Sequence, residues 1–196
     1  MENEWDFENL ETKKIYQKIK SKGIPLEKYS SKKINFGIKT GLDEVYVINE
    51  NKKKELEKQH SSSKEIIKPF LIGKQIKRYF YEWSDSYIIL VKKGIDIERY
   101  PAIFNYLKQY KEKLENRTDI KDKTKWFELR PCSYYDDFIK PKIVYAHFGK
   151  RPQFTLDTNN YYVNPKSYIL PIEYKYLLGL LNSKTIAFYS IYMSLR

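Results

Sequence analysis

Two short triplets combine an acidic residue with a lysine two positions later, a spacing with which metal-dependent nucleases hold a divalent cation and orient a water molecule. They are Asp119-Ile120-Lys121 and Glu173-Tyr174-Lys175. Neither follows a Pro-Asp pair that would complete such a site, and in a chain with 32% charged residues such triplets arise by chance. We therefore interpret both as non-catalytic. The neighbouring carboxylates Asp136 and Asp137 are more typical of a solvated loop than of a cation site.

The few cysteine and histidine residues offer little support for metal or thiol chemistry. The only cysteine, Cys132, excludes an internal disulfide, and it has only His60 and His147 as further soft ligands, which is too few for a plausible zinc site. Cys132 has no nearby histidine in the sequence, so we interpret it as a small packed residue.

A glycine-flanked loop at residues 37–41 is too short for a phosphate-cradling P-loop, which needs four residues between its glycines. Two interpretations stay open. It is either a plain hairpin turn or a place where the backbone approaches DNA while Lys39 and Thr40 touch a phosphate or a base edge.

The charge balance favours a polyanionic partner. The chain has 37 Lys and Arg against 25 Asp and Glu, a formal charge of +12, and cations that neutralise phosphates bind nucleic acids of any sequence. The 19 tyrosines would suit stacking on bases as well as core packing. The alternative is that abundant Lys, Asn, Ile and Tyr reflect only a low-GC coding sequence.

Affinity for DNA and sequence reading should lie on different residues, because phosphates carry no sequence information. The predicted phosphate contacts are Lys39, Lys74, Lys77, Arg78, Lys142 and Lys150. The predicted base readers are Arg130, Arg151 and Gln153, since Arg can bind guanine bidentately and Gln can bind adenine in the same way. Residues 149–153 are expected to form a loop tip between two strands, whereas Tyr134, Tyr135, Trp126 and Phe127 are expected mainly in the core.

These side chains need a scaffold, and hydrophobic periodicity predicts a mixture of helices and strands. Helices are expected at about 6–22, 101–117 and 173–195. Strands are expected at 34–36, 45–48, 66–72, 79–83, 87–91, 143–146, 154–156, 161–163 and 167–170, the first two as a hairpin. Residues 51–64 are expected to form a surface loop or a short solvated helix. Without regular βαβ alternation this order predicts an α+β domain with a mixed, mostly antiparallel twisted sheet and flanking helices.

The same pattern suggests an N-terminal docking helix at 1–25, the main domain at 26–172 and a C-terminal helical segment at 173–196, which we expect to be truncated. Nothing resembles a membrane span or a signal peptide, so we expect a soluble, cytoplasmic protein.

Six phrases, in order, resemble the TaqI-like C-terminal specificity domain of restriction-modification enzymes. They are Gly37 to Ile48, Ile66 to Tyr79, Tyr100 to Arg117, Trp126 to Arg130, Pro141 to Val144 and Tyr176 to Ser183. Asp43 and Gln75 stand where that family usually has Asn and Asp. The resemblance covers most of the chain, from about Leu26 to Ser183.

The resemblance implies a target-recognition domain that holds double-stranded DNA for N6-adenine methylation. The catalytic domain would lie on the same or a partner polypeptide, with S-adenosylmethionine and, if a nuclease is joined, Mg²⁺. No cofactor is expected on this chain. An adenine methyltransferase needs an Asn/Asp-Pro-Pro-Tyr/Phe motif, and Asn164-Pro165-Lys166-Ser167 lacks the second proline and the aromatic residue, so we interpret it as a turn.

Three alternatives stay open at this point. The phrase Leu181-Asn182-Ser183 also fits the recognition half of a type I restriction specificity subunit. A non-DNA interaction module would explain the charge by composition alone. A free-standing nuclease would require the triplets at Asp119 or Glu173 to cut DNA.

Overall fold

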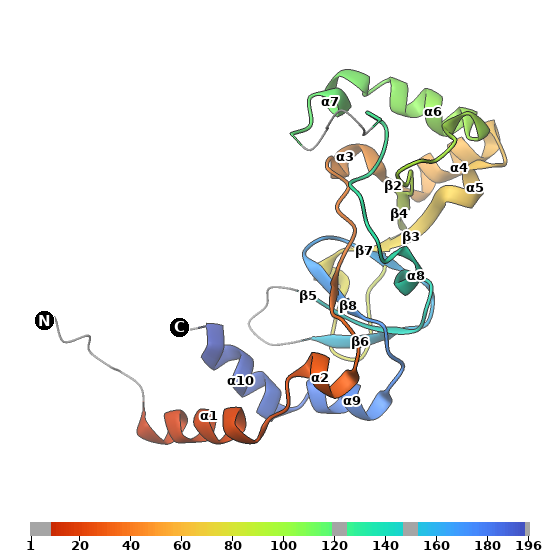
Figure 1. The fold of residues 1–196 in the computed structure, drawn as a ribbon. Helices are drawn as coiled ribbons and strands as arrows, with labels where there is room; N and C mark the ends of the chain where they lie inside the picture. Colours follow the sequence, from red (N-terminus) through yellow and green to blue (C-terminus); the bar gives the residue numbers. More distant parts are fainter. Residues whose placement is uncertain (1–8, 119–124, 147–152, 195–196) are drawn as a thin grey trace, which may run out of the picture.

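The computed structural model describes residues 9–118, 125–146 and 153–194 (Figure 1). Its α-helices are α1 Leu10–Lys22, α2 Leu26–Ser30, α3 Asp43–Tyr46, α4 Glu50–Gln59, α5 Ser63–Ile66, α6 Pro101–Lys108, α7 Lys111–Glu115, α8 Tyr135–Phe138, α9 Lys175–Leu181 and α10 Lys184–Ser194. Its strands are β1 Asn35–Phe36, β2 Val47–Asn49, β3 Ile67–Leu71, β4 Ser86–Ile89, β5 Lys142–Ala146, β6 Phe154–Asp157, β7 Tyr162–Val163 and β8 Ser167–Leu170. Two short 3-10 helices, η1 Gly73–Gln75 and η2 Ile97–Arg99, complete the described elements.

The strands form two four-stranded sheets, with the orders β1-β8-β5-β6 and β2-β4-β3-β7. All neighbours pair antiparallel except β3 and β7, which run parallel with Phe70 opposite Tyr162. This confirms the α+β class with mixed, mostly antiparallel pairing, although the strands are divided between two sheets. In Figure 1, α3 to α7 gather around β2, β3 and β4, while α1, α2, α9 and α10 lie at the opposite end, beyond β6.

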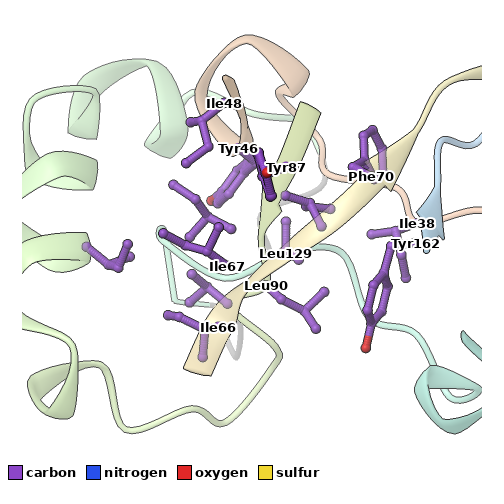
Figure 2. Packing of buried hydrophobic residues seen from close by; sticks show 14 of the residues in the cluster. Ile38, Tyr46, Ile48, Ile66, Ile67, Phe70, Tyr87, Leu90, Leu129 and Tyr162 are labelled. Carbon is purple, nitrogen blue, oxygen red and sulfur yellow. The ribbon is translucent and has the colours of Figure 1, made fainter. Parts of the chain in front are cut away.

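One large apolar cluster joins the two sheets, and β3 runs through it. Phe70 and Leu71 have no exposed surface, because both faces of this strand are covered. Figure 2 shows Ile38 and Tyr162 beside the Phe70 end of β3. A second cluster packs α9 on β5, β6 and β8 through Leu177, Leu178 and Leu181.

The helices begin and end largely for local reasons. The Asn9 side chain accepts a hydrogen bond from the Glu11 amide at 2.9 Å and caps α1, and the amide of Gly23 donates to Ile19 O at its end. Pro101 stands at the first turn of α6, where its missing N–H is not needed. The charged segment after Asn49 forms the helix α4, and its Leu56 side chain is buried in the core.

Four expected elements differ from the structure, and the first is the helix expected at 173–195, which is interrupted at Asn182 and Ser183 between α9 and α10. Residues 45–48 do not pair back on 34–36 as a hairpin, because Val45 and Tyr46 belong to α3 and the strands β1 and β2 lie in different sheets. No strand forms at 79–83, because residues 77–80 make a tight turn that is closed by a single bridge between Ile76 and Tyr81. The helix expected at 101–117 is interrupted at Gln109 and Tyr110, between α6 and α7.

Candidate nucleic-acid interface

A turn at Asn164 to Ser167, between β7 and β8, gathers segments that are far apart in the sequence. The Asn164 Oδ1 atom accepts hydrogen bonds from the Gly73 amide at 3.1 Å and from the Ser167 hydroxyl at 2.9 Å. From the other side, the amides of Gly37 and Ile38 donate to Ser167 O and Val163 O at 2.9 and 2.8 Å. The segments that precede Lys39 and Lys74 are therefore fixed to one turn.

The approach of Gly37 to this turn leaves no room for a side chain. A Cβ atom built on Gly37 would lie 2.0 Å from Asn164 O and 2.4 Å from Val163 O. Both atoms belong to the backbone and cannot swing aside, so this position requires glycine. The first glycine of the predicted loop is thus explained by a close backbone approach within the protein.

Lys39 and Arg130 line one open hollow of about 450 Å³ beside this turn. Pro165 of the turn and the segment from Thr40 to Asp43 complete its lining. Lys39 is exposed, with its Nζ atom 5.6 Å from the centre of the Phe36 ring, and Arg130 is half-buried. The structure brings together a predicted phosphate contact and a predicted base reader that the sequence separates widely.

Thr40 was expected to contact DNA, and the structure corrects this. Its side chain is 1% exposed, its hydroxyl donates to the Asp43 carboxylate, and the same oxygen accepts from the Leu42 amide at 3.2 Å. Both bonds hold the first turn of α3. A hydroxyl committed in this way is turned inward and has no surface to offer a phosphate.

Lys142 was expected to contact phosphate, and this prediction is also wrong. It begins β5 with no exposed surface, and its ammonium group donates to the Asp157 carboxylate and to Phe138 O at 2.6 Å. Burial lowers the pKa of Lys142, and the adjacent Asp157 carboxylate opposes that effect. The Lys142 ammonium is paired with a buried carboxylate and is not available to a phosphate.

A second group of predicted contacts lies on the turn at residues 77–80. The Lys77 amide donates to Phe80 O at 2.9 Å and closes the turn, and the Tyr79 amide donates to Phe154 O of β6, also at 2.9 Å. Arg78 is exposed and its guanidinium carbon lies 5.1 Å from the centre of the Tyr79 ring. Lys77 is less available, because its Nζ atom is 3.4 Å from a carboxylate oxygen of Glu82.

The 77–80 turn lies beside the β5–β6 hairpin, where the loop tip at 149–153 was expected. Gln153 is exposed and directly precedes Phe154, the residue that accepts from the Tyr79 amide. Lys150 and Arg151 lie outside the described residues. Arg78 and Gln153 are therefore carried on segments that the backbone joins directly.

Lys74 connects the two groups. It is exposed on η1, next to Gly73. A Cβ atom built on Gly73 would lie 3.5 Å from the Ala146 side chain and 3.5 Å from Lys166 O. The η1 helix thus contacts both the end of β5 and the Asn164 turn. Lys39, Arg130 and Lys74 lie at the Asn164 turn, and η1 and the end of β5 connect them with the joined segments of Arg78 and Gln153. We call these five residues the basic rim.

Sequence reasoning missed Arg117, which fixes the backbone next to Lys39 and Arg130. Its guanidinium group is buried and donates to four carbonyl oxygens, those of Thr40, Leu114, Trp126 and Glu128, at 2.8 to 3.1 Å. It joins the segment after Lys39 to the segment before Arg130. The available signal was its spacing of three residues from the buried Leu114, which places both on one side of a helical turn.

The acidic residues considered for metal chemistry have structural contacts or lie apart. The Asp137 carboxylate accepts from Asn35 Nδ2 at 2.9 Å and from Lys140 Nζ at 3.1 Å, and Glu173 is exposed ahead of α9. Asp119 lies outside the described residues. In the ranges 9–118, 125–146 and 153–194 no group of three His, Cys, Asp or Glu side chains gathers as metal ligands, and no helix is long and apolar enough to cross a membrane.

The chain belongs to the TaqI-like C-terminal specificity domain family, whose model matches residues 68–195. It is similar to three type II methyltransferases. The identity is 28% to M.MjaIV of Methanocaldococcus jannaschii, over 77% of this chain and 54% of that protein. M.BstVI of Geobacillus stearothermophilus is 23% identical over 85% of this chain and 30% of that protein. M.BanIII of Aneurinibacillus aneurinilyticus is 27% identical over 68% and 26%.

The chain therefore spans about half or less of the length of these relatives. Among solved structures it resembles the type IIL restriction-modification enzyme MmeI, which was determined in complex with DNA. That match has a TM-score of 0.54 and 14% identity, and it covers 78% of this chain and 21% of MmeI. At this identity the likeness concerns the fold.

Proposed function

We propose that this chain is the DNA target-recognition domain of a restriction-modification methyltransferase. The observation that carries the proposal is the basic rim, where predicted phosphate contacts and base readers from distant parts of the sequence meet at the Asn164 turn. Membership of a specificity-domain family and similarity to type II methyltransferases support the same function. The full-length relatives are longer than this chain, which leaves room for a separate catalytic domain.

In this proposal the residues divide the work of binding. Lys74 and Arg78, with Lys39 and in part Lys77, neutralise phosphates, while Arg130 and Gln153 face base edges. Lys150 and Arg151 remain predicted contacts of the same surface. Residues 26–172 carry recognition, and the helical segments at 1–25 and 173–196 face the rest of the enzyme.

The duplex held on this surface would be presented to a methyltransferase domain that transfers a methyl group from S-adenosylmethionine to N6 of an extrahelical adenine. Detecting methylated adenines in the genomes of cells with and without the complete gene tests this step. A specific sequence that loses N6-methyladenine on deletion is the expected result, and identical methylation in both strains would contradict it.

Binding itself is tested by fluorescence anisotropy with a labelled duplex over a salt series. We expect log K to fall linearly with log salt, and Lys74→Ala or Arg78→Ala to reduce that slope by about 1 each. Lys58→Ala on α4, a matched exposed lysine on the helical side of the other sheet, should leave the slope unchanged. Absence of binding at low salt would favour a non-DNA interaction module.

A further inference from the structure

Two adjacent aromatic rings project from the 77–80 turn. Tyr79 and Phe80 are 50% and 54% exposed, so apolar ring surface stays in contact with solvent, which costs free energy. The next residue, Tyr81, behaves differently, since its ring contacts Tyr161 with centroids 5.0 Å apart. The turn therefore presents two rings outward and anchors itself with the third.

The backbone holds these rings in a conformation that their residue types disfavour. Tyr79 has φ 75°, in the left-handed region where glycine is preferred and a bulky side chain is strained. Strain of this kind persists only where the surroundings impose it, and it is concentrated at functional sites. Here the surroundings are two hydrogen bonds, donated by the Lys77 amide to Phe80 O and by the Tyr79 amide to Phe154 O, and the bridge between Ile76 and Tyr81.

The charges beside the rings indicate what they meet. Arg78 lies over the Tyr79 ring, and the exposed Lys74 belongs to the same segment of the basic rim. Exposed apolar rings among cations suit a partner that is both anionic and flat-faced, which describes a nucleic acid with accessible bases. A purely apolar protein partner would leave these cations buried without counterions.

We infer that Tyr79 and Phe80 form an aromatic wedge that stacks on base faces at a locally unstacked step of the bound DNA, while Arg78 holds a neighbouring phosphate. This inference rests on the proposed function. Side chains that enter a base step unstack it and bend the duplex, and the cost is lowest where pairing is already broken. The hydrogen-bonded turn fixes the backbone that carries the rings before binding, so little backbone conformational entropy is lost.

The inference is tested by comparing the affinity of this chain for a fully paired duplex with that for the same duplex carrying a central abasic site. The unaltered chain should prefer the abasic duplex by roughly tenfold, the scale expected when one or two rings gain stacking contacts. The double variant Tyr79→Gly/Phe80→Ser should lose this preference. Glycine keeps the left-handed backbone, so the variant should fold at least as stably as the original chain.

Two controls separate this inference from the proposed function. Because the double variant keeps every cation, its salt slope on the paired duplex should equal that of the original chain. Tyr176→Ser on α9 removes a ring that is 66% exposed and should change neither quantity. 2-Aminopurine beside the abasic site should be quenched by the original chain and not by the double variant.

Two results would overturn the wedge while leaving salt-dependent binding intact. In one, the original chain binds both duplexes with equal affinity; in the other, the double variant still prefers the abasic duplex. Loss of all duplex binding in the original chain would overturn the wedge and the proposed function together. A double variant that binds DNA normally but no longer associates with a methyltransferase domain would assign the rings to a protein contact instead.

Discussion

Lys142 of β5 and Asp157 of β6 stand directly opposite each other in the antiparallel register and form an ion pair in which neither side chain has exposed surface. The Asp157 carboxylate also accepts hydrogen bonds from the amides of Asn159 and Tyr161, at 2.8 and 3.0 Å. This pair fixes the β5–β6 hairpin, whose outer end carries Gln153.

Removing one member of this pair should strongly destabilise the folded chain. Asp157→Ala leaves a buried ammonium without a counterion, and we expect a loss of about 3–5 kcal/mol in the free energy of unfolding by urea denaturation. Lys142→Met/Asp157→Asn should lose less, because no uncompensated charge remains. Lys140→Ala breaks the exposed pair with Asp137 and should cost under about 1 kcal/mol. Equal losses in the single buried and exposed variants would contradict the role assigned to the pair.

Gly37→Ala should be strongly destabilising, because its Cβ would meet backbone atoms of Asn164 and Val163. We expect at least about 3 kcal/mol, as for overpacking at a site that cannot relax. Gly179→Ala is the matched control, since a Cβ there meets nothing within 4 Å in α9 and should stabilise by roughly 0.5–1 kcal/mol. Thermal denaturation of both variants checks this, and a Gly37→Ala variant as stable as the control would disprove the close approach.

Arg117→Lys should destabilise the chain by roughly 2–4 kcal/mol. A lysine has no planar fork and cannot reach the four carbonyl oxygens that the guanidinium group joins, so several buried acceptors lose their donors. Arg99→Lys, at a largely exposed pair with Glu65, should change stability by under about 0.5 kcal/mol. Urea denaturation of the two variants tests the difference, and similar midpoints would show that the carbonyl cluster does not depend on arginine.

Stability should fall between about pH 10 and 12. Burial raises the pKa of both Tyr161 and Tyr162 to about 12 from an ordinary value of 10.0. In this window the unfolded state loses the phenolic protons while the folded state keeps them, so the contribution present below pH 10 is lost as pH rises through the folded pKa. Urea midpoints, with tyrosinate absorbance as a second readout, measure this. Tyr162→Phe should make the decline shallower, and a midpoint that rises over the same range would refute the assignment.

Several elements could be predicted because their cause is local. β5, β6 and β8 are runs of β-branched and aromatic residues bounded by Pro, Gly or Asn, and all three were placed within a residue or two. The helix α1 was predicted to end at Lys22 because Gly23 and Pro25 follow it. The family could be identified for a similar reason, since its phrases are contiguous in the chain.

Other elements depend on partners that are distant in sequence. Val45 and Tyr46 have the composition of a strand, yet they form α3, where Tyr46 Oη donates to Phe127 O and Tyr106 Oη donates to Val45 O. The 79–83 segment is likewise aromatic, but it does not form a strand. The Tyr79 amide donates to Phe154 O, and the Tyr81 ring packs against Tyr161, so distant residues hold this segment at a turn.

The sequence by itself determined the α+β class, most strand positions, the basic character and the family resemblance, because these depend on composition and on short-range patterns. Only the tertiary structure decided which lysines are available. Lys74 and Lys142 are the same residue type, yet one is exposed on η1 and the other is buried. The physical reason is that burying a charge is costly unless an opposite charge is paired with it. The pairing of β5 with β6 places Asp157 opposite Lys142 and supplies that charge.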